Sequence, residues 1–287
     1  MPAVNETPDS PEVSIITVVL NDVAGIKNTL ESVRLQDYGK IEHIVIDGGS
    51  TDGTVDIIRQ YQRESLIWLS EPDSGIYNAM NKGLSKAGGR LIGTLNSGDS
   101  YSSDTVTRLI DVYRDSPETD VFHGNISLIS GCESLEEIFY PDLDYSRLPF
   151  KMTLNHPGSF ITRKAYEDYG KYNEYYKIAG DYELFSRFYL KGARFKYIDH
   201  IMAYMAAGGI SETKAMASAF ECNIARISHG ISGSRSGSIL AKDILLITLR
   251  DIFRFLRLYC LIRAWRRSDN QAKKEKIKAI ELERRPW

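Results

Sequence analysis

Four aspartates of this chain lie close to apolar runs that are typical of β-strands. Asp47, Asp73 and Asp99 follow such runs directly or within a few residues, and Asp181 opens a helical pattern. In an open α/β sheet, carboxylates at these places gather in the crevice beyond the carboxyl ends of the strands, where ligands bind. Several acids in one crevice suit a divalent cation, a diphosphate and proton transfer, which is the chemistry of sugar transfer from a nucleotide donor.

Asp47 ends an apolar run and is followed by Gly48, Gly49, Ser50 and Thr51. A carboxylate at this place can accept a hydrogen bond from a nucleoside, and the small residues after it allow a ligand to approach the backbone. The alternative is a helix cap, for which Ser50 and Thr51 are suitable residues. Asp47 comes too early to be that cap, so we favour a binding role.

Asp99 and Asp181 are candidates for two further tasks. A hard cation bound to phosphates typically takes one or two protein carboxylates, and Asp99 is placed for that role; an ordinary turn aspartate is the alternative. Asp181 is the candidate general base, and its aromatic neighbours Tyr175, Tyr176, Tyr182 and Phe185 predict a partly dry wall beside it. The alternative for Asp181 is a cap at the positive end of the following helix. We favour catalysis because the other acids already indicate a site.

Up to Asp120, β-branched runs alternate with residues at helical spacing. Continuous apolar runs are typical of strands buried on both faces, and helices between them indicate βαβ units. The fold class is therefore α/β, a Rossmann-like and mainly parallel sheet flanked by helices. Strands are predicted at residues 13–20, 41–46, 66–69 and 90–95.

Beyond Asp120 the pattern is looser. It predicts an antiparallel pair at a sheet edge, a short strand, a helix ended by Gly192 and another strand, at residues 121–129 with 133–140, 159–163, 181–192 and 195–205. The Gly/Ser-rich stretch at 228–238 predicts a flexible linker. The predicted organisation is a disordered lead-in, a main domain, the linker and a basic helical tail, over residues 1–12, 13–227, 228–238 and 239–287.

Composition excludes several classes of protein. A hydrophobic content of 43% allows a sizeable core, and a formal charge of −2 gives no support to a nucleic-acid partner. Cys132, Cys222 and Cys260 are odd in number and widely spaced, which favours reduced thiols in the cytoplasm. The first residues lack the features of a signal peptide, and no run of about 18 apolar residues predicts a membrane-spanning helix.

The tail predicts a basic amphipathic helix. Asp243, Arg250, Arg254 and Arg257 fall on one helical face, and most apolar residues fall elsewhere. Two interpretations stay open: a helix packed on the core or on a second copy of the chain, and a helix lying on an anionic membrane surface.

Taken together and in this order, the segments IDGGSTDGT, EPDSGIYNAMNKG, LNSGDSY and AGDYELFSR resemble the family 2 glycosyltransferases. HPGSFITR and AGGIS, around the last of them, fit the same family, so that the resemblance runs from about Val13 to Ser211. These are inverting enzymes with one Rossmann-like domain of the GT-A type. The segments are most similar to the branch that builds bacterial exopolysaccharide, such as colanic acid and O-antigen.

The resemblance implies a role for each candidate residue. Asp181 would be the catalytic base, and Asp99 would hold Mn²⁺ or Mg²⁺. His156 and Gly180 would lie on the acceptor side. The nucleotide sugar, with UDP-sugars favoured, would be bound by Thr17, Val18, Asn21, Asp47, Asp73, Asn81, Ser97 and Gly98. The acceptor would be a glycan or a polyprenyl-diphosphate-linked glycan, at the inner face of the cytoplasmic membrane.

The sequence departs from the family at Gly48, Gly98 and Gly180, where many relatives carry a second acid, and at Met80, where an arginine is frequent. These departures keep open a non-catalytic protein that binds nucleotide sugar or glycan in an assembly complex. A dinucleotide-dependent oxidoreductase is disfavoured, because the segment after the first strand, NDVAGIKN, contains a single glycine instead of G-x-G-x-x-G.

Overall fold

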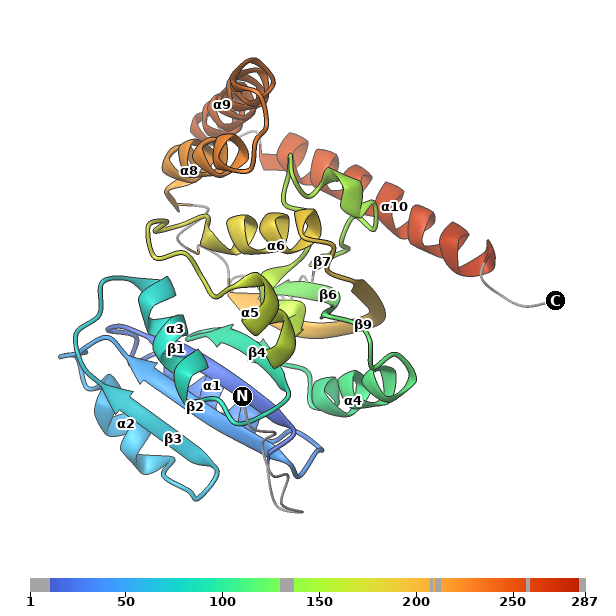
Figure 1. Ribbon diagram of the computed structural model, residues 1–287. Coiled ribbons are helices and arrows are strands. Elements are labelled where there is room, and N and C mark those ends of the chain that lie inside the picture. Colours follow the sequence, from blue (N-terminus) through green and yellow to red (C-terminus); the bar gives the residue numbers. More distant parts are fainter. Residues whose placement is uncertain (1–10, 130–136, 207–208, 210–212, 257–258, 284–287) are drawn as a thin grey trace.

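The computed structural model describes residues 11–129, 137–206, 209, 213–256 and 259–283 (Figure 1). The described strands form one nine-stranded sheet in the order β3-β2-β1-β4-β8-β6-β9-β5, with β7 added beside β6. Their bounds are β1 Val13–Val19, β2 Ile41–Asp47, β3 Leu66–Ser70, β4 Leu91–Asn96, β5 Ser100–Tyr101, β6 Val121–Ile129, β7 Glu137–Phe139, β8 Ser159–Thr162 and β9 Phe195–Ala206.

The strand directions confirm the predicted mainly parallel sheet. β1 runs parallel to β2 and β4, β2 runs parallel to β3, and β6 runs parallel to β9. Because β8 is antiparallel to both β4 and β6, these two strands point the same way. The carboxyl ends of β1 to β4, β6 and β9 therefore share one edge of the sheet. The predicted antiparallel pair is β6 with β7, in which only β7 lies outside the main order of strands.

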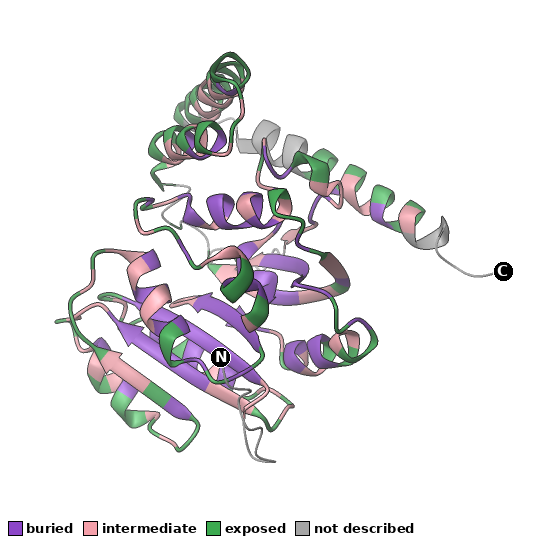
Figure 2. Ribbon diagram, viewed as in Figure 1, coloured by how far each residue is buried: buried purple, intermediate pink, exposed green. Residues whose placement is uncertain are grey.

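Helices cover both faces of the sheet, which explains why β1 is buried along its whole length. One face packs against α3 (Ile76–Lys86), α5 (Arg163–Tyr169) and α6 (Gly180–Leu190). The other face packs against α1 (Ile26–Arg34), α2 (Thr54–Gln60) and α4 (Thr105–Asp115). Two short 3₁₀ helices, η1 (Tyr145–Arg147) and η2 (His156–Gly158), precede β8. Figure 2 shows the buried residues concentrated in the strands and in α6.

The C-terminal part is helical, as predicted, and consists of α8 (Ala215–Ser228), α9 (Gly233–Phe255) and α10 (Tyr259–Glu283). α8 lies against α6, and α9 packs on α8 (Figure 1). The structure differs from the predicted linker at 228–238, because residues 233–238 form the first turns of α9. Serine and glycine there make a helix start that the pattern alone assigned to a flexible chain. The predicted division into domains remains a proposal.

Two other sequence-based expectations concern thiols and membrane spans. Cys222 is a free thiol whose pKa burial raises to about 12. Cys132 and residues 1–10 of the predicted lead-in lie outside the described residues. Within the described part of the chain, no helix is both long and apolar enough to cross a membrane.

The buried His43 gives the fold a predictable response to acid. Its Nε2 lies 2.9 Å from Oγ1 of Thr17, and burial lowers the pKa of His43 to about 3. The unfolded chain takes up a proton on this ring below about pH 6.5, whereas the folded chain does not. His43 therefore destabilises the fold progressively as the pH falls from about 6.5 toward 3, by up to about 1.4 kcal/mol per pH unit.

We expect His43→Gln to weaken this pH dependence, measured as the free energy of unfolding in urea at several pH values between about 7 and 5. His200→Gln is the matched control, because His200 lies at the surface in an ion pair with Asp104. An unchanged pH dependence in His43→Gln would contradict the prediction.

Candidate active site

The loops after β1 to β4 lie in a row along the shared edge of the sheet. We call residues 20–25, 47–53, 70–75 and 97–99 together the strand-end rim. Asn21 joins the first two of these loops: its backbone N–H donates to Oγ of Ser50 (2.7 Å), and its Oδ1 accepts from the N–H of Thr51 (2.9 Å). Asn21 has a φ of 50°, a left-handed conformation that asparagine tolerates. Its side chain thus shapes the rim.

Asp47 is fully buried at the centre of the strand-end rim. Its carboxylate accepts from the N–H groups of Gly49 (3.0 Å) and Ser50 (2.9 Å), from the Ser50 hydroxyl, and from the hydroxyl of Ser70 (2.6 Å). A buried carboxylate is tolerated only when such donors surround it. Asp47 therefore holds the turn that follows β2 within the strand-end rim.

Asp73 occupies the space that the missing side chain of Gly48 leaves open. A Cβ atom on Gly48 would lie 2.6 Å from Oδ2 of Asp73, closer than two such atoms approach. Oδ1 of Asp73 accepts from the N–H of Gly75 (2.8 Å), which fixes the carboxylate. An acid at position 48 is therefore incompatible with this place of Asp73. The carboxylate of Asp73, from the neighbouring loop, therefore lies directly beside Gly48.

Asp22 and Asp99 approach one another across β1 and β4. Ser97 donates through its hydroxyl to Oδ2 of Asp22 (2.6 Å), and Oδ1 of Asp99 accepts from the N–H of Ala206 at the end of β9 (3.0 Å). Asp99 is 6% exposed. Burial and the nearby charge of Asp22 raise the pKa of Asp99 to about 7, against the opposing effect of the Ala206 N–H.

Asp22 was not among the residues predicted from the sequence. Asp22 does contribute to the start of α1, because its Oδ1 accepts from the N–H of Gly25 (3.0 Å). Its second oxygen, however, turns toward the β4 loop. An acid one position after Asn21, at the end of the first strand, is the signal that could have revealed it. Gly98, with a φ of 91°, passes close to the same carboxylate.

Asp22 and Asp99 have the chemistry of a divalent cation site. The influences that set the pKa of Asp99 include burial and a second carboxylate but no Lys, Arg or His of the described chain. A divalent cation would offset that buried negative charge. Among the described residues, no group of three or more His, Cys, Asp and Glu side chains could hold a metal ion by itself. The residues fit a cation that takes its remaining ligands from phosphate and water.

Asp181 lies in the first turn of α6, beside the first turn of α3. The hydroxyl of Tyr77 donates to the carbonyl of Ile178 (2.7 Å) and accepts from the N–H of Asp181 (3.3 Å). A Cβ atom on Gly180 would lie 2.6 Å from the Tyr77 ring, so that only glycine allows this contact. Asp181 is half-buried, and its Oδ1 accepts from the N–H of Tyr182 (2.8 Å).

The segment that carries Asp181 also contacts the strand-end rim. Nζ of Lys177 donates to the carbonyl of Ser74 (3.0 Å), directly after Asp73. The structure therefore brings the segments of Asp47, Asp73 and Asp181 together through contacts between neighbours, and it joins Asp99 to the same rim through Asp22. Of the predicted aromatic wall, Tyr176, Tyr182 and Phe185 belong to the core, whereas Tyr175 is 70% exposed, so that the prediction is wrong for Tyr175.

Asn81, a predicted nucleotide contact, forms hydrogen bonds within the chain. Its Oδ1 accepts from the N–H of Tyr172 (3.1 Å), and its Nδ2 donates to the Tyr172 carbonyl (2.9 Å) and to Oε1 of Glu174 (2.8 Å). Asn78, one turn away, donates to the same carboxylate (2.9 Å). These amides attach α3 to the loop that leads to Asp181, and the side chain of Asn81 is thereby used within the chain.

The side chains of Thr17, Val18 and His156, which were predicted at a ligand, are buried in the described structure. Thr17 is fully buried against His43, and Val18 belongs to the core of the α3 side. The ring of His156 lies beneath α6, where its Nε2 is 3.0 Å from Oγ1 of Thr94 and 2.9 Å from the hydroxyl of Tyr172. Burial lowers the pKa of His156, against the opposing charge of Asp181. These three side chains are part of the support of the site.

Met80, at the position where relatives carry arginine, is 1% exposed and packs in the core. A charged side chain at this place would have to leave that core, so Met80 makes no direct contact with a ligand from its buried position. Methionine at position 80 therefore contributes to the packing of α3 on the core.

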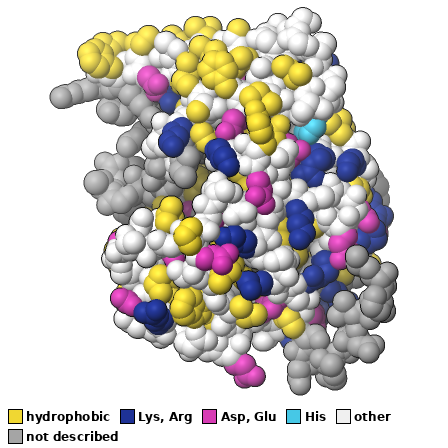
Figure 3. All heavy atoms as spheres, turned by 60° about the vertical axis from the view of Figure 1, so that its left-hand side comes forward, with side chains coloured by type: hydrophobic (Ala, Val, Ile, Leu, Met, Phe, Trp, Pro, Cys, Tyr) yellow, Lys and Arg dark blue, Asp and Glu magenta, His cyan; other side chains and the backbone are white. Residues whose placement is uncertain are grey.

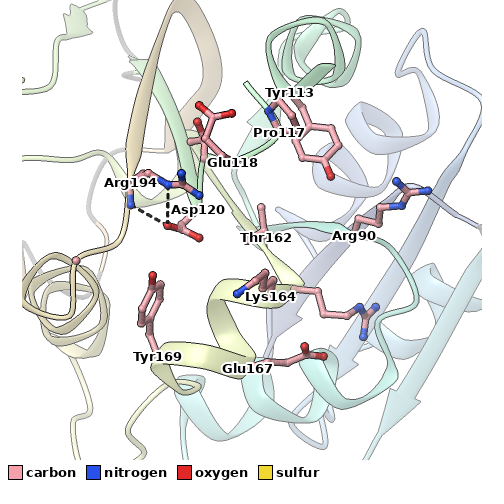
Figure 4. Close-up of a pocket in the computed structure, with 13 residues that line it drawn as sticks. Arg90, Tyr113, Pro117, Glu118, Asp120, Thr162, Lys164, Glu167, Tyr169 and Arg194 are labelled. Atoms are coloured by element: carbon pink, nitrogen blue, oxygen red, sulfur yellow. Dashed lines mark hydrogen bonds and ion pairs between the residues drawn. The ribbon is translucent and has the colours of Figure 1, made fainter. Parts of the chain in front are cut away.

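The larger of the two described hollows lies elsewhere. Its volume is about 620 Å³, and its walls come from the starts of β4, β6 and β9, at the opposite edge of the sheet from the rim (Figure 4). Several of its charged groups are already paired: Arg194 with Asp120, Lys164 with Asp168, and Arg163 with backbone carbonyls. We therefore place the candidate site at the strand-end rim.

A family model described as glycosyl transferase family 2 matches residues 14–170. The chain belongs to glycosyl transferase family 2. It is 35% identical over 184 residues to an uncharacterized glycosyltransferase of Mycobacterium tuberculosis, which covers 62% of this chain and 69% of that protein. It is 32% identical over 210 residues to a PGL/p-HBAD biosynthesis glycosyltransferase of Mycobacterium bovis, over 71% of this chain and 80% of the relative.

Solved structures confirm the fold of this family 2 glycosyltransferase. Residues 1–349 of S. aureus TarS in complex with UDP superpose with a TM-score of 0.59 at 20% identity, over 81% of this chain and 70% of that TarS chain. The mannosyltransferase PcManGT of Pyrobaculum calidifontis, in complex with GDP-Man and Mn²⁺, gives 0.60 at 17% identity, over 95% and 88%. The predicted GT-A fold and glycosyltransferase class are thus confirmed.

Proposed function

We propose that this glycosyltransferase moves a sugar, with inversion of configuration, from a nucleoside diphosphate to a glycan or lipid-linked glycan of a bacterial surface polysaccharide. The observation that supports the proposal is the contact of Lys177, just before α6, with the carbonyl of Ser74, which joins the segment that leads to Asp181 to the strand-end rim beside Asp73. Relatives named for PGL/p-HBAD and teichuronic acid biosynthesis support the class of product.

The donor is proposed to lie along the strand-end rim. Asp73 is the carboxylate that meets the nucleoside, and Asn21 and Asp47 hold the turns around it. Ser97 and Gly98 border the diphosphate beside Asp99. The resemblance to the family favours a UDP-sugar, and TarS structures with UDP and with UDP-GlcNAc support that choice.

The reaction is proposed to be a single displacement. Asp181 accepts the proton of the acceptor hydroxyl while the hydroxyl oxygen forms its bond to the anomeric carbon from the face opposite the diphosphate. The bond between the anomeric carbon and the diphosphate breaks as the new one forms. Gly180 gives Asp181 its place against Tyr77, and His156 supports α6 from beneath.

Asp99 and Asp22 are proposed to hold Mn²⁺ or Mg²⁺ on the donor. When bound, the cation supplies positive charge to the departing diphosphate. PcManGT, whose structure contains Mn²⁺, supports a divalent cation in proteins of this fold. The protein's own contribution is to keep two carboxylates close together in a largely buried place.

Donor binding tests the proposed rim. We expect UDP-GlcNAc, or GDP-mannose if the donor base is guanine, to raise the melting temperature with Mn²⁺ present, because a ligand of the folded state stabilises it by mass action. Asp99→Ala should remove most of the rise, whereas Asp111→Ala, a change of the same charge on the surface of α4, should keep it. An undiminished, Mn²⁺-dependent rise in Asp99→Ala would remove Asp99 from the site.

Turnover separates an enzyme from a binding protein of an assembly complex. Asp181→Asn should keep the donor-induced rise in melting temperature and lower the rate of sugar transfer by about 100-fold or more, since general base catalysis typically contributes 10²–10⁴-fold. Release of UDP or GDP from the donor in the presence of acceptor measures the rate. Asp168→Asn, at an exposed ion pair, is the control. Equal transfer by Asp181→Asn would exclude Asp181 as the base.

The location of the acceptor is suggested by the orientation of α9. Asp243 of α9 pairs at 3.0 Å with Arg226 of α8, a residue that is 3% exposed. Apolar residues of α9 lie at the surface, with Leu249 39% and Ile252 46% exposed. Exposing the apolar side of an amphipathic helix is unfavourable in water unless something covers it.

The exposed apolar face extends over two helices. We call it the α8–α9 face; its exposed members are Met216, Phe220, Ile224, Ile227, Leu245, Leu246, Leu249, Ile252, Phe255 and Leu256. Figure 3 shows hydrophobic side chains gathered at the top of the molecule, where α8 and α9 lie in Figure 1. A hollow of about 300 Å³ opens between the two helices beside Met216, Ile252 and Phe255.

We infer that the α8–α9 face lies on an anionic membrane surface. From Lys242 onward the sequence has 13 Lys and Arg against 6 Asp and Glu, whereas the preceding part has 23 against 32. The α9 members of this face, from Leu245 onward, lie in the positive part of an otherwise negative chain, which is the pattern of an interfacial helix on anionic lipid. An acceptor attached to a lipid would then lie within reach of the same molecule.

Vesicle binding tests this inference. We expect the protein to sediment with vesicles of phosphatidylglycerol and phosphatidylcholine and less with phosphatidylcholine alone. Leu249→Ser with Ile252→Ser should reduce the bound fraction severalfold, and Leu35→Ser with Leu190→Ser, at exposed leucines elsewhere, should not. Absence of binding would contradict the inference. A dimer in sedimentation velocity that the first pair of substitutions dissociates would show that a second copy covers the face.

A further inference from the structure

A carboxylate from α8 holds the backbone directly before Asp181. The side chain of Glu221 accepts from three consecutive N–H groups, those of Lys177 (3.0 and 3.1 Å), Ile178 (2.8 Å) and Ala179 (2.9 Å). Ala179 is the residue that caps α6, and Asp181 follows it by two positions. One side chain, more than forty residues away in the sequence, therefore accepts hydrogen bonds from the three N–H groups of residues 177–179, which lead into α6.

The charge of Glu221 suits this place. Successive N–H groups that point at one spot form an anion-binding concavity, and the start of a helix adds the positive end of its dipole. Hydrogen bonds to an ionised acceptor are stronger than neutral ones. In the described structure, the carboxylate of Glu221 occupies this concavity.

The other anchors of the same segment come from the opposite side. Tyr77 of α3 binds the carbonyl of Ile178, and Lys177 reaches the carbonyl of Ser74 in the strand-end rim. These contacts leave the N–H groups of residues 177–179 to Glu221. The segment is thus held between α3 on one side and α8 on the other, and both anchors are needed to fix the start of α6.

We propose that Glu221 is a positioning residue for Asp181: it fixes the start of α6 so that the Asp181 carboxylate meets the acceptor hydroxyl. The proposal rests on the proposed role of Asp181 as the base. Without Glu221, three N–H groups lose their acceptor, and the first turn of α6 can move relative to the rim. A displacement of about 1 Å at a reacting group can lower a rate about 100-fold.

Amide hydrogen exchange tests the anchor without any substrate. In Glu221→Gln, which keeps the shape of the side chain but removes its charge, the amides of residues 177–179 should exchange about 10- to 100-fold faster, the range expected for lost hydrogen bonds to a charged group. Asn223→Ala is the matched control: Asn223 lies on the same helix and binds Ser236 of α9. Unchanged exchange in Glu221→Gln, or equally fast exchange in Asn223→Ala, would overturn the anchor.

Kinetics test the link to Asp181, with the donor that turns over in the wild-type protein. Glu221→Gln should lower kcat about 10- to 100-fold and leave KM for the donor unchanged, because the rim is intact. In an Asp181→Asn background the same substitution should have little further effect, since residues that act through one group are non-additive. A full additional loss in that background, or a loss of donor binding, would show a general structural role and overturn the proposal.

The two readouts keep the failures apart. If Asp181→Asn transfers sugar normally, the proposed base is wrong, whereas exchange of residues 177–179 still reports on the anchor. If Glu221→Gln does not fold, Glu221→Asp, which keeps the charge on a shorter side chain, replaces it in both experiments. The kcat of Glu221→Asp should lie between those of the wild type and Asp181→Asn. If Glu221→Asp has the kcat of the wild type and slow exchange at residues 177–179, the length of the Glu221 side chain is not needed to position Asp181.

Discussion

The buried carboxylate of Asp47 is the fixed point on which the candidate site depends. A charge in this place is stable only because hydroxyl and backbone donors from the loops after β2 and β3 surround it. The turn that it closes presents Ser50 to the backbone of Asn21, so that the first and second loops become one unit. Asp22 follows directly and meets Ser97 from the fourth loop. A series of hydrogen bonds that begins at buried Asp47 thus connects the four loops of the strand-end rim.

The glycines at which this chain departs from its family have a common explanation in space. Gly48 leaves room for the carboxylate of Asp73, Gly180 leaves room for the ring of Tyr77, and Gly98 has a left-handed backbone beside Asp22. At two of these places an acid is supplied by an adjacent loop. Glycine at positions 48 and 98 is therefore compatible with a rim that carries several carboxylates.

The sequence predicted the strands and helices well because burial repeats along it. β1 to β4 lie within about a residue of their predicted ends, since a buried parallel strand leaves an uninterrupted apolar run. The direction of single side chains was harder to predict. Thr17, Asn81 and His156 belong to the correct segments, but each side chain finds its partner within the chain. Which polar group meets a ligand depends on partners distant in sequence, and a local pattern does not contain them.

In the second half of the chain, too, the contacts that hold the candidate site join residues distant in sequence. The family match ends at residue 170, before Asp181 and before α8. Buried Glu183 of α6 pairs with Arg187 and lies 3.3 Å from His229 at the end of α8, and Glu221 binds the other end of the same junction. α8 is therefore fastened to both sides of the α6 start, while its outer face belongs to the α8–α9 face. α8 therefore carries part of the α8–α9 face on one side and holds the approach to Asp181 on the other, so the proposed membrane contact and the proposed base share one structural element.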